Sequence, residues 1–393
     1  MNLPITATLS DELQRQMTEW RHQIHQHPET AYEEFKTAKL VAETLTSVGI
    51  EVYQNIAETG VVGVLRKGNS ERSVGLRADM DALDIHEDND LSYCSQVKGK
   101  MHACGHDGHT AMLLGAAVHL AKHVEFDGTI YFIFQPAEEV RGGAKAMIDE
   151  GLFKKFPMDM VFGLHNMPGI QTGKFSICEG PMMAAFAHFE CEITGKGGHS
   201  STPHLNIDPV QIGTELVQKW QSIITLDIPA SETAVVSTTE FHAGTAINVC
   251  PETALLRGSC RSLSNEIAAL IERRMREIAE QTCSERGATC RFEYHQAYPV
   301  LINGAEGTKR ALKAAESVAG KEMTSSEQQP IMGSEDFAEM LLECPGAYIF
   351  LGNGTESRGG CMIHNPGYDF NDENLSVGAQ YWITIACQYL NEK

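Results

Sequence analysis

The order of strand-like and helix-like segments is the sequence feature that most constrains the fold of this chain. Runs rich in β-branched and aromatic residues indicate strands, and they fall at residues 60–66, 73–78, 129–135 and 160–165. Helical periodicity occupies the stretches around them, as the apolar stripe of Leu13, Met17, Trp20 and Ile24 and over residues 31–47 and 106–124. Strands that alternate with helices in this way predict an α/β domain built on a mostly parallel sheet.

The pattern changes at about residue 184. Strands at residues 186–194, 234–241, 254–261 and 289–295 and helices at residues 208–223 and 264–283 follow the order βαββαβ, which is the ferredoxin-like split unit. The α/β pattern then resumes, with helices at residues 308–320 and 334–342, a strand at residues 347–352 and a last helix from residue 372. We therefore predict a main domain of residues 1–183 and 298–393, interrupted by an inserted domain of residues 184–297.

The composition excludes several classes of protein. The chain has 31 Lys and Arg residues against 52 Asp and Glu residues, a net charge of −21. Such a surface repels phosphate backbones and anionic lipid, which argues against nucleic acid and membranes as partners. No apolar run reaches the length of about 18 residues that a membrane-spanning helix needs, and we expect no secretion signal. The 11 cysteines contain no C-x-x-C pair, so we expect reduced thiols in a cytoplasmic protein.

Chemically active residue types gather at the turns that follow the predicted strands. Cys104 and His106 stand two residues apart in the glycine-containing turn of MHACGHDGH. Glu138 and Glu139 come directly after a strand, and His165 ends the next strand. Because open α/β sheets bind their ligands at the carboxyl ends of the strands, we expect these side chains to meet.

A thiol, several imidazoles and a pair of carboxylates are ligand types that borderline divalent metals prefer. His364, in the segment MIHNPGYDFND before the last helix, adds a further imidazole. Each residue alone has an ordinary structural explanation, such as a buried core cysteine or a solvated pair of glutamates at a helix start. Their coincidence at turns beside one sheet predicts a metal site.

Nine sequence blocks occur in the order that is typical of one enzyme family. They are RHQIHQHPETAYEE, GLRADMDAL, HACGHDGHT, QPAEE, GLHN, GKGGHSSTPH, GTAINVCPE, GSEDFA and HNPGYDFND. With these blocks the chain resembles the aminoacylase, carboxypeptidase and hippurate hydrolase family of metal-dependent amidohydrolases over nearly its whole length. The cysteine of HACGHD makes it most similar to the branch of hippurate hydrolases and auxin-conjugate (indole-acyl amino acid) amidohydrolases.

The resemblance implies a catalytic domain that binds two divalent metal ions and an inserted lid domain that often mediates dimerisation. The implied metal ligands are Cys104, His106, Glu139, His165 and His364, with Cys104 bridging both ions where other branches use Asp. Glu138 matches the general base, which accepts a proton from the attacking water and passes it to the leaving amine. The thiolate and the imidazoles favour zinc, with manganese, cobalt or nickel as alternatives.

The lid contributes the rest of the site that the resemblance implies. His199 in GKGGHSS matches the residue that polarises the scissile carbonyl, and in many members it comes from the partner subunit. Asn248 and Arg261 match positions that bind the substrate α-carboxylate, with an ordinary surface salt bridge as the alternative for Arg261. Gly333 and Ser334 in GSEDF are expected to open a helix and offer backbone N–H groups to the same carboxylate, with a plain helix N-cap as the alternative for Ser334.

The same blocks contain polar residues to which we assign supporting roles. Asp79 and Asp81 are predicted to orient the histidine ligands, with a purely structural turn as an equal alternative. Other branches have a ligand histidine where Asp79 stands. His109 is expected to hydrogen-bond nearby backbone, and the segment HQIHQH at residues 22–27 is expected to be a solvated helix end and loop.

These observations together predict a metal-dependent amidohydrolase. The expected substrates are N-acyl amino acids, either hippurate-like or N-acetyl compounds, cleaved next to a free carboxylate to give a carboxylic acid and an amino acid. A dipeptidase or carboxypeptidase that acts on short peptides with the same residues is the first alternative, and a non-catalytic protein that binds acyl amino acids is the second. We expect a homodimer that forms through the lid domain.

Overall fold

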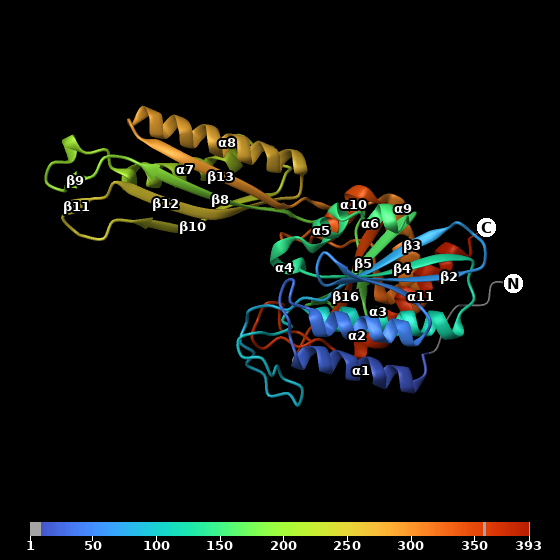
Figure 1. Cartoon of the computed structure of the whole chain (residues 1–393). Helices are drawn as coiled ribbons and strands as arrows, with labels where there is room; N and C mark the ends of the chain where they lie inside the picture. The colour runs from blue at the N-terminus through green and yellow to red at the C-terminus, as the bar shows by residue number, and fades with distance from the viewer. Residues whose placement is uncertain (1–8, 357–358, 393) are drawn as a thin grey trace. The chain divides into compact units, whose positions relative to one another are not determined.

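The computed structural model describes residues 9–356 and 359–392, without the side chains of Val140 and Arg141 (Figure 1). Its chain divides into two compact units. Unit 1 comprises Met1–Gly180, Ile302–Gln329 and Asp336–Lys393, and unit 2 comprises Pro181–Leu301 and Pro330–Glu335. Residues 330–335, which the sequence analysis left in the main domain, therefore pack with the inserted segment. The chain passes between the units in the short strands β7 (Gly180–Met183) and β14 (Leu301–Asn303), and again on both sides of residues 330–335.

An eight-stranded sheet forms the core of unit 1, in the order β1-β2-β4-β3-β5-β16-β6-β15. The strands are β1 (Glu51–Ile56), β2 (Gly60–Lys67), β3 (Ser73–Asp79), β4 (Gly128–Gln135), β5 (Met160–Pro168), β6 (Phe175–Ser176), β15 (Thr324–Ser325) and β16 (Gly346–Gly354). The central strands β4, β3, β5 and β16 run parallel, whereas β1 and β2 are antiparallel additions at one edge. Every residue of β3, β4 and β16 is buried, as expected for parallel strands covered on both faces. The predicted α/β class with a mostly parallel sheet is confirmed.

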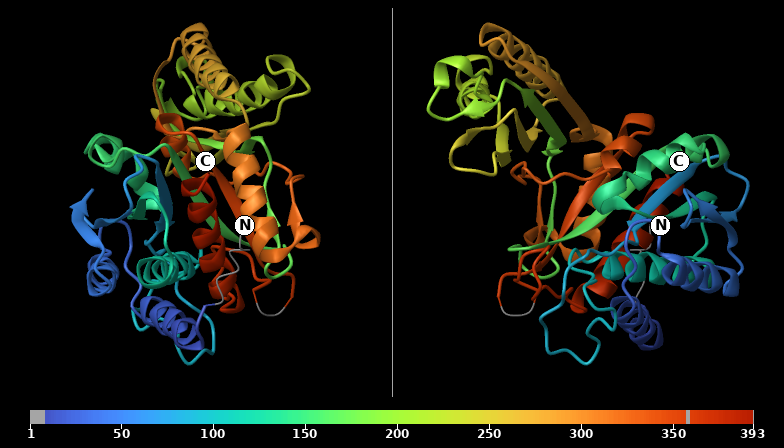
Figure 2. Two further views of the ribbon diagram at one scale, coloured as in Figure 1. Left: turned by 90° about the vertical axis from the view of Figure 1, so that its right-hand side faces the viewer. Right: turned by 60° about the vertical axis from the view of Figure 1, so that its left-hand side comes forward.

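Helices cover this sheet. They are α1 (Asp11–Gln26), α2 (Phe35–Ser47), α3 (His106–His123), α4 (Glu138–Arg141), α5 (Gly143–Asp149), α6 (Leu152–Lys155), α9 (Ala305–Ala319), α10 (Phe337–Glu343) and α11 (Glu373–Leu390), with a 3-10 turn at Lys321–Met323. The predicted stripe of α1 is buried, and α1 packs on α3. Helices α9 and α11 lie side by side, as the left view of Figure 2 shows.

Helices α2, α9 and α10 begin three or more residues away from their predicted starts, and α9 begins at Ala305 rather than at residue 308. Helix α2 begins at Phe35 rather than near residue 31, because Tyr32 has a left-handed backbone with φ of 64° that a helix cannot include. Helix α10 begins at Phe337, so Ser334 does not open it. In the described part of the chain, no helix combines the length and apolar character needed to cross a bilayer.

Unit 2 has the predicted element order βαββαβ. It consists of β8 (Ala185–Thr194), α7 (Pro209–Leu226), β10 (Ala234–Ala243), β12 (Thr253–Ser262), α8 (Asn265–Glu285) and β13 (Thr289–Tyr298). The sheet is antiparallel in the order β10-β12-β8-β13, and its alternate residues pack with both helices around Phe189, Trp220 and Ile271. Asp208 and Ser264 cap the two helices. Short strands β9 (Gly198–His199) and β11 (Val249–Cys250) pair with each other, and Pro203–Leu205 forms a 3-10 turn.

Candidate metal centre

The five residues predicted as metal ligands lie together in unit 1. The parallel strands β3, β4 and β5 end at one edge of the sheet, where the turn before α3 carries Cys104 and His106, α4 carries Glu139, and β5 carries His165. The Cys104 Sγ atom lies 3.3 Å from His165 Nε2, and Glu139 Oε1 lies 4.0 Å from His106 Nε2. His364 reaches the same place from the loop before α11, with its Nε2 3.2 Å from Glu139 Oε1.

These donor atoms form two groups that share one sulfur. The atoms of Cys104, His106 and His165 lie within 4.8 Å of one another, and so do those of Cys104, Glu139 and His364. A shared central thiolate is the arrangement that a bridging ligand between two cations requires. Glu138 lies beside both groups, because one of its carboxylate oxygens is within 4.8 Å of the His106 donor of the first group and the Glu139 donor of the second.

Two buried polar atoms in this cluster lack a hydrogen-bond partner among the residues that the structure describes. They are His106 Nε2 and Glu139 Oε1, and His364 Nε2 approaches the second without hydrogen-bond geometry. A buried polar atom without a partner is costly, and an ion between the donors would satisfy both atoms. The residues present therefore fit a site for divalent cations.

The histidine rings are oriented by bonds on their far sides. His106 Nδ1 lies 2.9 Å from the Asp81 backbone oxygen and 3.2 Å from Asp81 Oδ1, which leaves Nε2 facing the cluster. His165 Nδ1 lies 2.6 Å from the Asn166 backbone oxygen, which leaves its Nε2 facing Cys104. Such support by a carbonyl or carboxylate is typical of histidines that bind metals. The His364 loop is tied to the cysteine turn, since its backbone N–H donates to the Ala103 oxygen at 2.7 Å.

The electrostatics of the cluster favour cation binding. Burial, together with the carboxylates of Glu139 and Glu138, raises the pKa of the Cys104 thiol well above its usual value. Burial and neighbouring histidines hold the pKa of His165 well below its usual value, so its ring is neutral and its lone pair is available. A cation would offset the excess of carboxylate charge and displace the thiol proton.

The supporting acids divide into two roles. Asp81 accepts from His106 and also from the Glu139 backbone N–H at 2.9 Å, in line with the predicted orientation of a histidine. Asp79 instead lies 2.6 Å from His109 Nδ1 and 2.6 Å from Arg77 Nη1. Of the two acids, only Asp81 lies at hydrogen-bond distance from a predicted ligand histidine, whereas Asp79 Oδ1 lies 3.8 Å from His106 Nε2.

The expected hydrogen bond between His109 and nearby backbone is present, and His109 also contacts two side chains. Its Nδ1 pairs with Asp79, and its Nε2 lies 2.7 Å from the Asn166 side-chain oxygen and 3.0 Å from the Asn166 backbone N. His109 thereby connects Asp79 to the residue that supports His165. The packing here is tight: Gly105 has φ of 100°, and a Cβ atom on it would lie 2.1 Å from Asn166 Oδ1.

The expectation that HQIHQH is a solvated segment is wrong for His25. Its ring is fully buried between Asp107, at 2.8 Å from Nδ1, and Glu87, at 3.1 Å from Nε2. Arg21, one turn earlier, is also buried and lies 3.0 Å from Asp107. The signal was present in the sequence, because Arg21 and His25 continue the four-residue spacing of Met17 on the buried face of α1. The network ties α1 to the residue that follows His106, one of the predicted ligands.

The predicted carbonyl-polarising residue of unit 2 is exposed. His199 lies in β9, opposite Val249 of β11, and its Nδ1 is held 2.7 Å from Ser201 Oγ. Asn248 is its neighbour, because the Ser200 N–H donates to the Asn248 backbone oxygen at 3.1 Å. The Nε2 edge of His199 is thus available to an external group.

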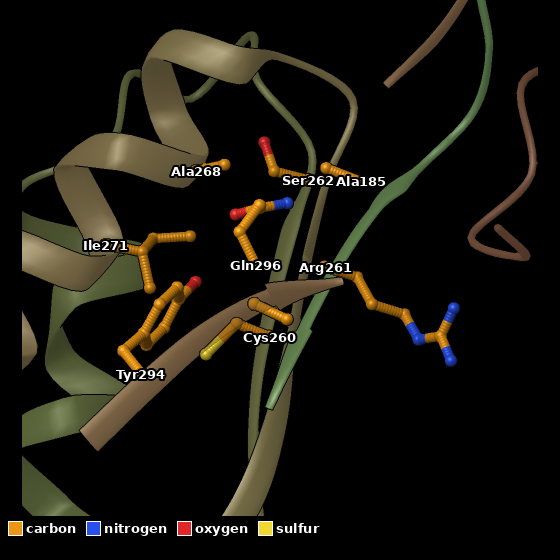
Figure 3. Close-up of a pocket in the computed structure, with 9 residues that line it drawn as sticks. Ala185, Cys260, Arg261, Ser262, Ala268, Ile271, Tyr294 and Gln296 are labelled. Atoms are coloured by element: carbon orange, nitrogen blue, oxygen red, sulfur yellow. The ribbon is translucent and has the colours of Figure 1, made fainter. Parts of the chain in front are cut away.

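Arg261 has no carboxylate partner among the described residues, so the surface salt bridge considered for it is not formed. Its guanidinium lies 4.6 Å from the Phe186 ring centre and donates to the Met332 backbone oxygen at 2.7 Å and to Ser334 Oγ at 2.9 Å. It points away from the small cavity beside Cys260 and Tyr294 (Figure 3). Burial without a counter-ion lowers the pKa of Arg261, and such a guanidinium is suited to bind an anion.

Two predictions about the GSEDF segment need correction. Ser334 is neither the start nor the cap of a helix, because α10 begins at Phe337 and its flanking residue is Asp336. The Ser334 hydroxyl instead accepts the bond from Arg261. Gly333 contributes its backbone oxygen, which accepts from the Ala184 N–H at 2.8 Å.

Comparison with known proteins gives the family. Residues 75–388 match the sequence profile described as peptidase family M20/M25/M40. The chain belongs to this family.

Two curated relatives and one solved structure illustrate the similarity. A hippurate hydrolase from Campylobacter jejuni is 42% identical over 379 residues, covering 96% of this chain and 98% of that protein. Thermostable carboxypeptidase 1 from Saccharolobus solfataricus is 39% identical over 389 residues, covering 96% and 97%. The crystal structure of a dinuclear metal-binding peptidase of the M20 family from Bacillus subtilis has a TM-score of 0.84 and 30% identity, covering 98% of this chain and 100% of that one.

In this M20-family hydrolase the lid residues cannot all contact one small substrate from a single chain. Arg261 pairs with Phe186 at one end of the unit 2 sheet. Thr253, at the other end of β12, lies about 26 Å away at roughly 3.3 Å per residue. His199 and Asn248 lie beyond that far end, where Figure 1 shows β9 and β11. Asn248 and Arg261 of one chain are therefore too far apart to bind the same carboxylate together.

Proposed function

We propose that this M20-family protein is a two-metal amidohydrolase that cleaves N-acyl amino acids next to a free carboxylate. Water and the amide give a carboxylic acid and an amino acid. The observation that carries the proposal is the pair of donor groups that meet at Cys104 and leave two buried atoms unpartnered. The similarity to a hippurate hydrolase over nearly the whole chain supports the choice of substrate.

The residues of the proposed centre have two roles, metal binding and proton transfer. Two divalent ions would be held by Cys104, His106, Glu139, His165 and His364, and when bound they would polarise the scissile carbonyl and lower the pKa of water. Glu138 accepts the proton of the attacking water and delivers it to the leaving nitrogen. Thiolate and imidazole ligands favour zinc, and manganese, cobalt and nickel are the alternatives.

The unpaired Arg261 sets the requirement for a carboxylate. A guanidinium can bind both oxygens of a carboxylate, and the backbone at Gly333 and Ser334 lies next to it. The same group would bind the terminal carboxylate of a short peptide. A dipeptidase or carboxypeptidase is therefore the second candidate function. The similarity to a carboxypeptidase supports this second candidate.

A substrate panel tests these assignments. We expect kcat/KM for hippurate and N-acetyl amino acids to exceed that for dipeptides, and hippuramide, which lacks the carboxylate, to be a poor substrate. Arg261→Ala should raise KM for hippurate by about 10- to 100-fold, because a hydrogen-bonded charged contact is lost.

Hippuramide is the control for the arginine, since the variant should leave its KM unchanged. An equal rise in KM for hippurate and hippuramide would show that Arg261 does not bind the substrate carboxylate. Faster cleavage of dipeptides than of every acyl amino acid would favour the peptidase.

We further propose a homodimer in which unit 2 of one chain supplies His199 and Asn248 to the metal centre of the other. The separation of these residues from Arg261 within one chain supports this exchange. Ile247, next to Asn248, is fully exposed, and Val249 is half exposed. Exposed large apolar side chains beside polar residues are typical of contact surfaces.

Mixing two inactive variants tests the exchange. His199→Ala and Glu138→Ala each remove one partner of the same reaction. If His199 acts across the dimer, random reassociation of equal amounts should restore about a quarter of the wild-type activity, since half of the dimers contain one complete site.

The matched control replaces the Glu138→Ala chain with the double variant Glu138→Ala/His199→Ala, which should restore nothing. Failure of the first mixture after exchange is verified, or a fully active monomer in gel filtration, would place His199 in its own chain's site.

A further inference from the structure

One buried carboxylate beside the metal centre has no part in the proposed mechanism. Glu34, the residue before α2, is fully buried. Its Oε1 accepts the backbone N–H of Ala137 at 2.9 Å, and its Oε2 accepts the Thr59 hydroxyl at 2.5 Å. Ala137 is the residue directly before Glu138 and Glu139, and 103 positions separate it from Glu34 in the sequence.

The backbone at Ala137 needs such a contact. Ala137 has φ of 55° and ψ of 40°, a left-handed conformation that residues other than glycine rarely adopt. This turn redirects the chain from the end of β4 into α4, so it sets the direction of both glutamate side chains. The Ala137 backbone oxygen is fixed as well, because it accepts the Gly143 N–H at 3.0 Å.

Two buried carboxylates hold the chain on either side of Glu138. Glu34 accepts from Ala137, and Asp81 accepts from the Glu139 N–H at 2.9 Å through Oδ2. Asp81 is also the residue that orients His106. The position of Glu138 is therefore set by bonds to the residues before and after it.

The Glu34 side chain is not needed by its own helix. Glu29 caps α2, since its carboxylate accepts the N–H groups of Lys36 at 2.9 Å and of Thr37 at 3.0 Å. The Glu34 side chain makes no capping bond. Burying this carboxylate is costly, because desolvation raises the pKa of Glu34 to about 7. The hydrogen bond from Thr59 lowers the pKa, and the nearby charge of Asp81 raises it further. The Glu34 carboxylate is buried at a free-energy cost, and it accepts hydrogen bonds from Thr59 and Ala137. These contacts indicate that Glu34 stabilises the turn at Ala137.

The geometry points to Glu34 as a positioning residue, which through the Ala137 N–H fixes the turn that directs Glu138 toward the reacting water and Glu139 toward the metal ions. This inference rests on the proposed hydrolase function for its catalytic consequence. Its structural part, the hold on residues 136–139, does not depend on that function.

The test compares Glu34→Ala with Glu34→Gln. Alanine removes the acceptor, so amide hydrogen exchange of the peptide around residues 136–143 should accelerate. We expect kcat for hippurate to fall about 10- to 100-fold, as is typical when the support of a metal ligand is lost. KM should stay within about twofold, because the carboxylate contact at Arg261 is intact. Glutamine keeps an acceptor oxygen and should restore slow exchange and most of kcat.

Glu33→Gln is the matched control, since it makes the same change one residue away at an exposed side chain that pairs with Lys100 at 2.8 Å. It should change neither exchange nor kcat. Unchanged exchange at residues 136–143 in Glu34→Ala would overturn the inference, and so would a glutamine variant as impaired as alanine. If the wild type cleaves no compound of the panel while Glu34→Ala still accelerates local exchange, the hydrolase function fails and the hold on the turn stands.

Discussion

Replacing Glu138 with alanine is expected to lower kcat by about 10²- to 10⁴-fold while the protein keeps its two metal ions. The reason is geometric. Glu138 and Glu139 are neighbours at the start of α4, but the two donor groups that share the Cys104 sulfur include Glu139 and not Glu138. Removing Glu138 therefore removes the group that moves the proton and leaves the donor set complete. Turnover of hippurate and elemental analysis of the same sample measure both effects.

Glu139→Ala is the contrasting variant for this experiment. It deletes a donor, so metal content and activity should fall together, whereas Glu138→Ala should lose activity alone. Undiminished turnover in Glu138→Ala would remove the proposed proton transfer from the mechanism. Loss of metal in both variants would show that Glu138 is itself a ligand.

Replacing Cys104 with alanine is expected to abolish metal binding and activity together, and replacing it with aspartate is expected to preserve both. Cys104 is the only residue common to the two donor groups, so its loss affects both ions. An aspartate offers two anionic oxygens from the same position and can bridge in the same way. Metal content and kcat/KM of the purified variants measure the outcome.

Cys387→Ala is the matched control, because Cys387 is another buried free thiol and lies in α11 of the same unit. That change should cost stability and leave metal content unchanged. Full metal content in Cys104→Ala would show that the sulfur is not shared. The apparent metal affinity of the wild type should also weaken as pH falls, since burial and nearby carboxylates raise the pKa of the Cys104 thiol and binding must displace its proton.

The sequence was sufficient for the features that depend on residues close together in the chain. Runs rich in β-branched and aromatic residues predicted the strands, because such residues pack well on a pleated sheet. The turn of Cys104 and His106 and the pair Glu138 and Glu139 were found in the same way, since strand ends in a parallel sheet meet at one edge. The order of the sequence blocks then indicated the family.

The tertiary structure alone decided how these residues are supported and which of them can act together. Glu34 lies against Ala137, and His25 lies against Asp107, across separations of 103 and 82 residues that no local pattern reveals. Ser334 was assigned to a helix that begins three residues later, and it binds Arg261 instead. The spacing of apolar residues predicts which side chains are buried, because the face that a side chain occupies is set by its own helix or strand. The partner of a buried polar group depends on how distant segments pack, and the distance from Arg261 to His199 depends on strand register in the folded sheet.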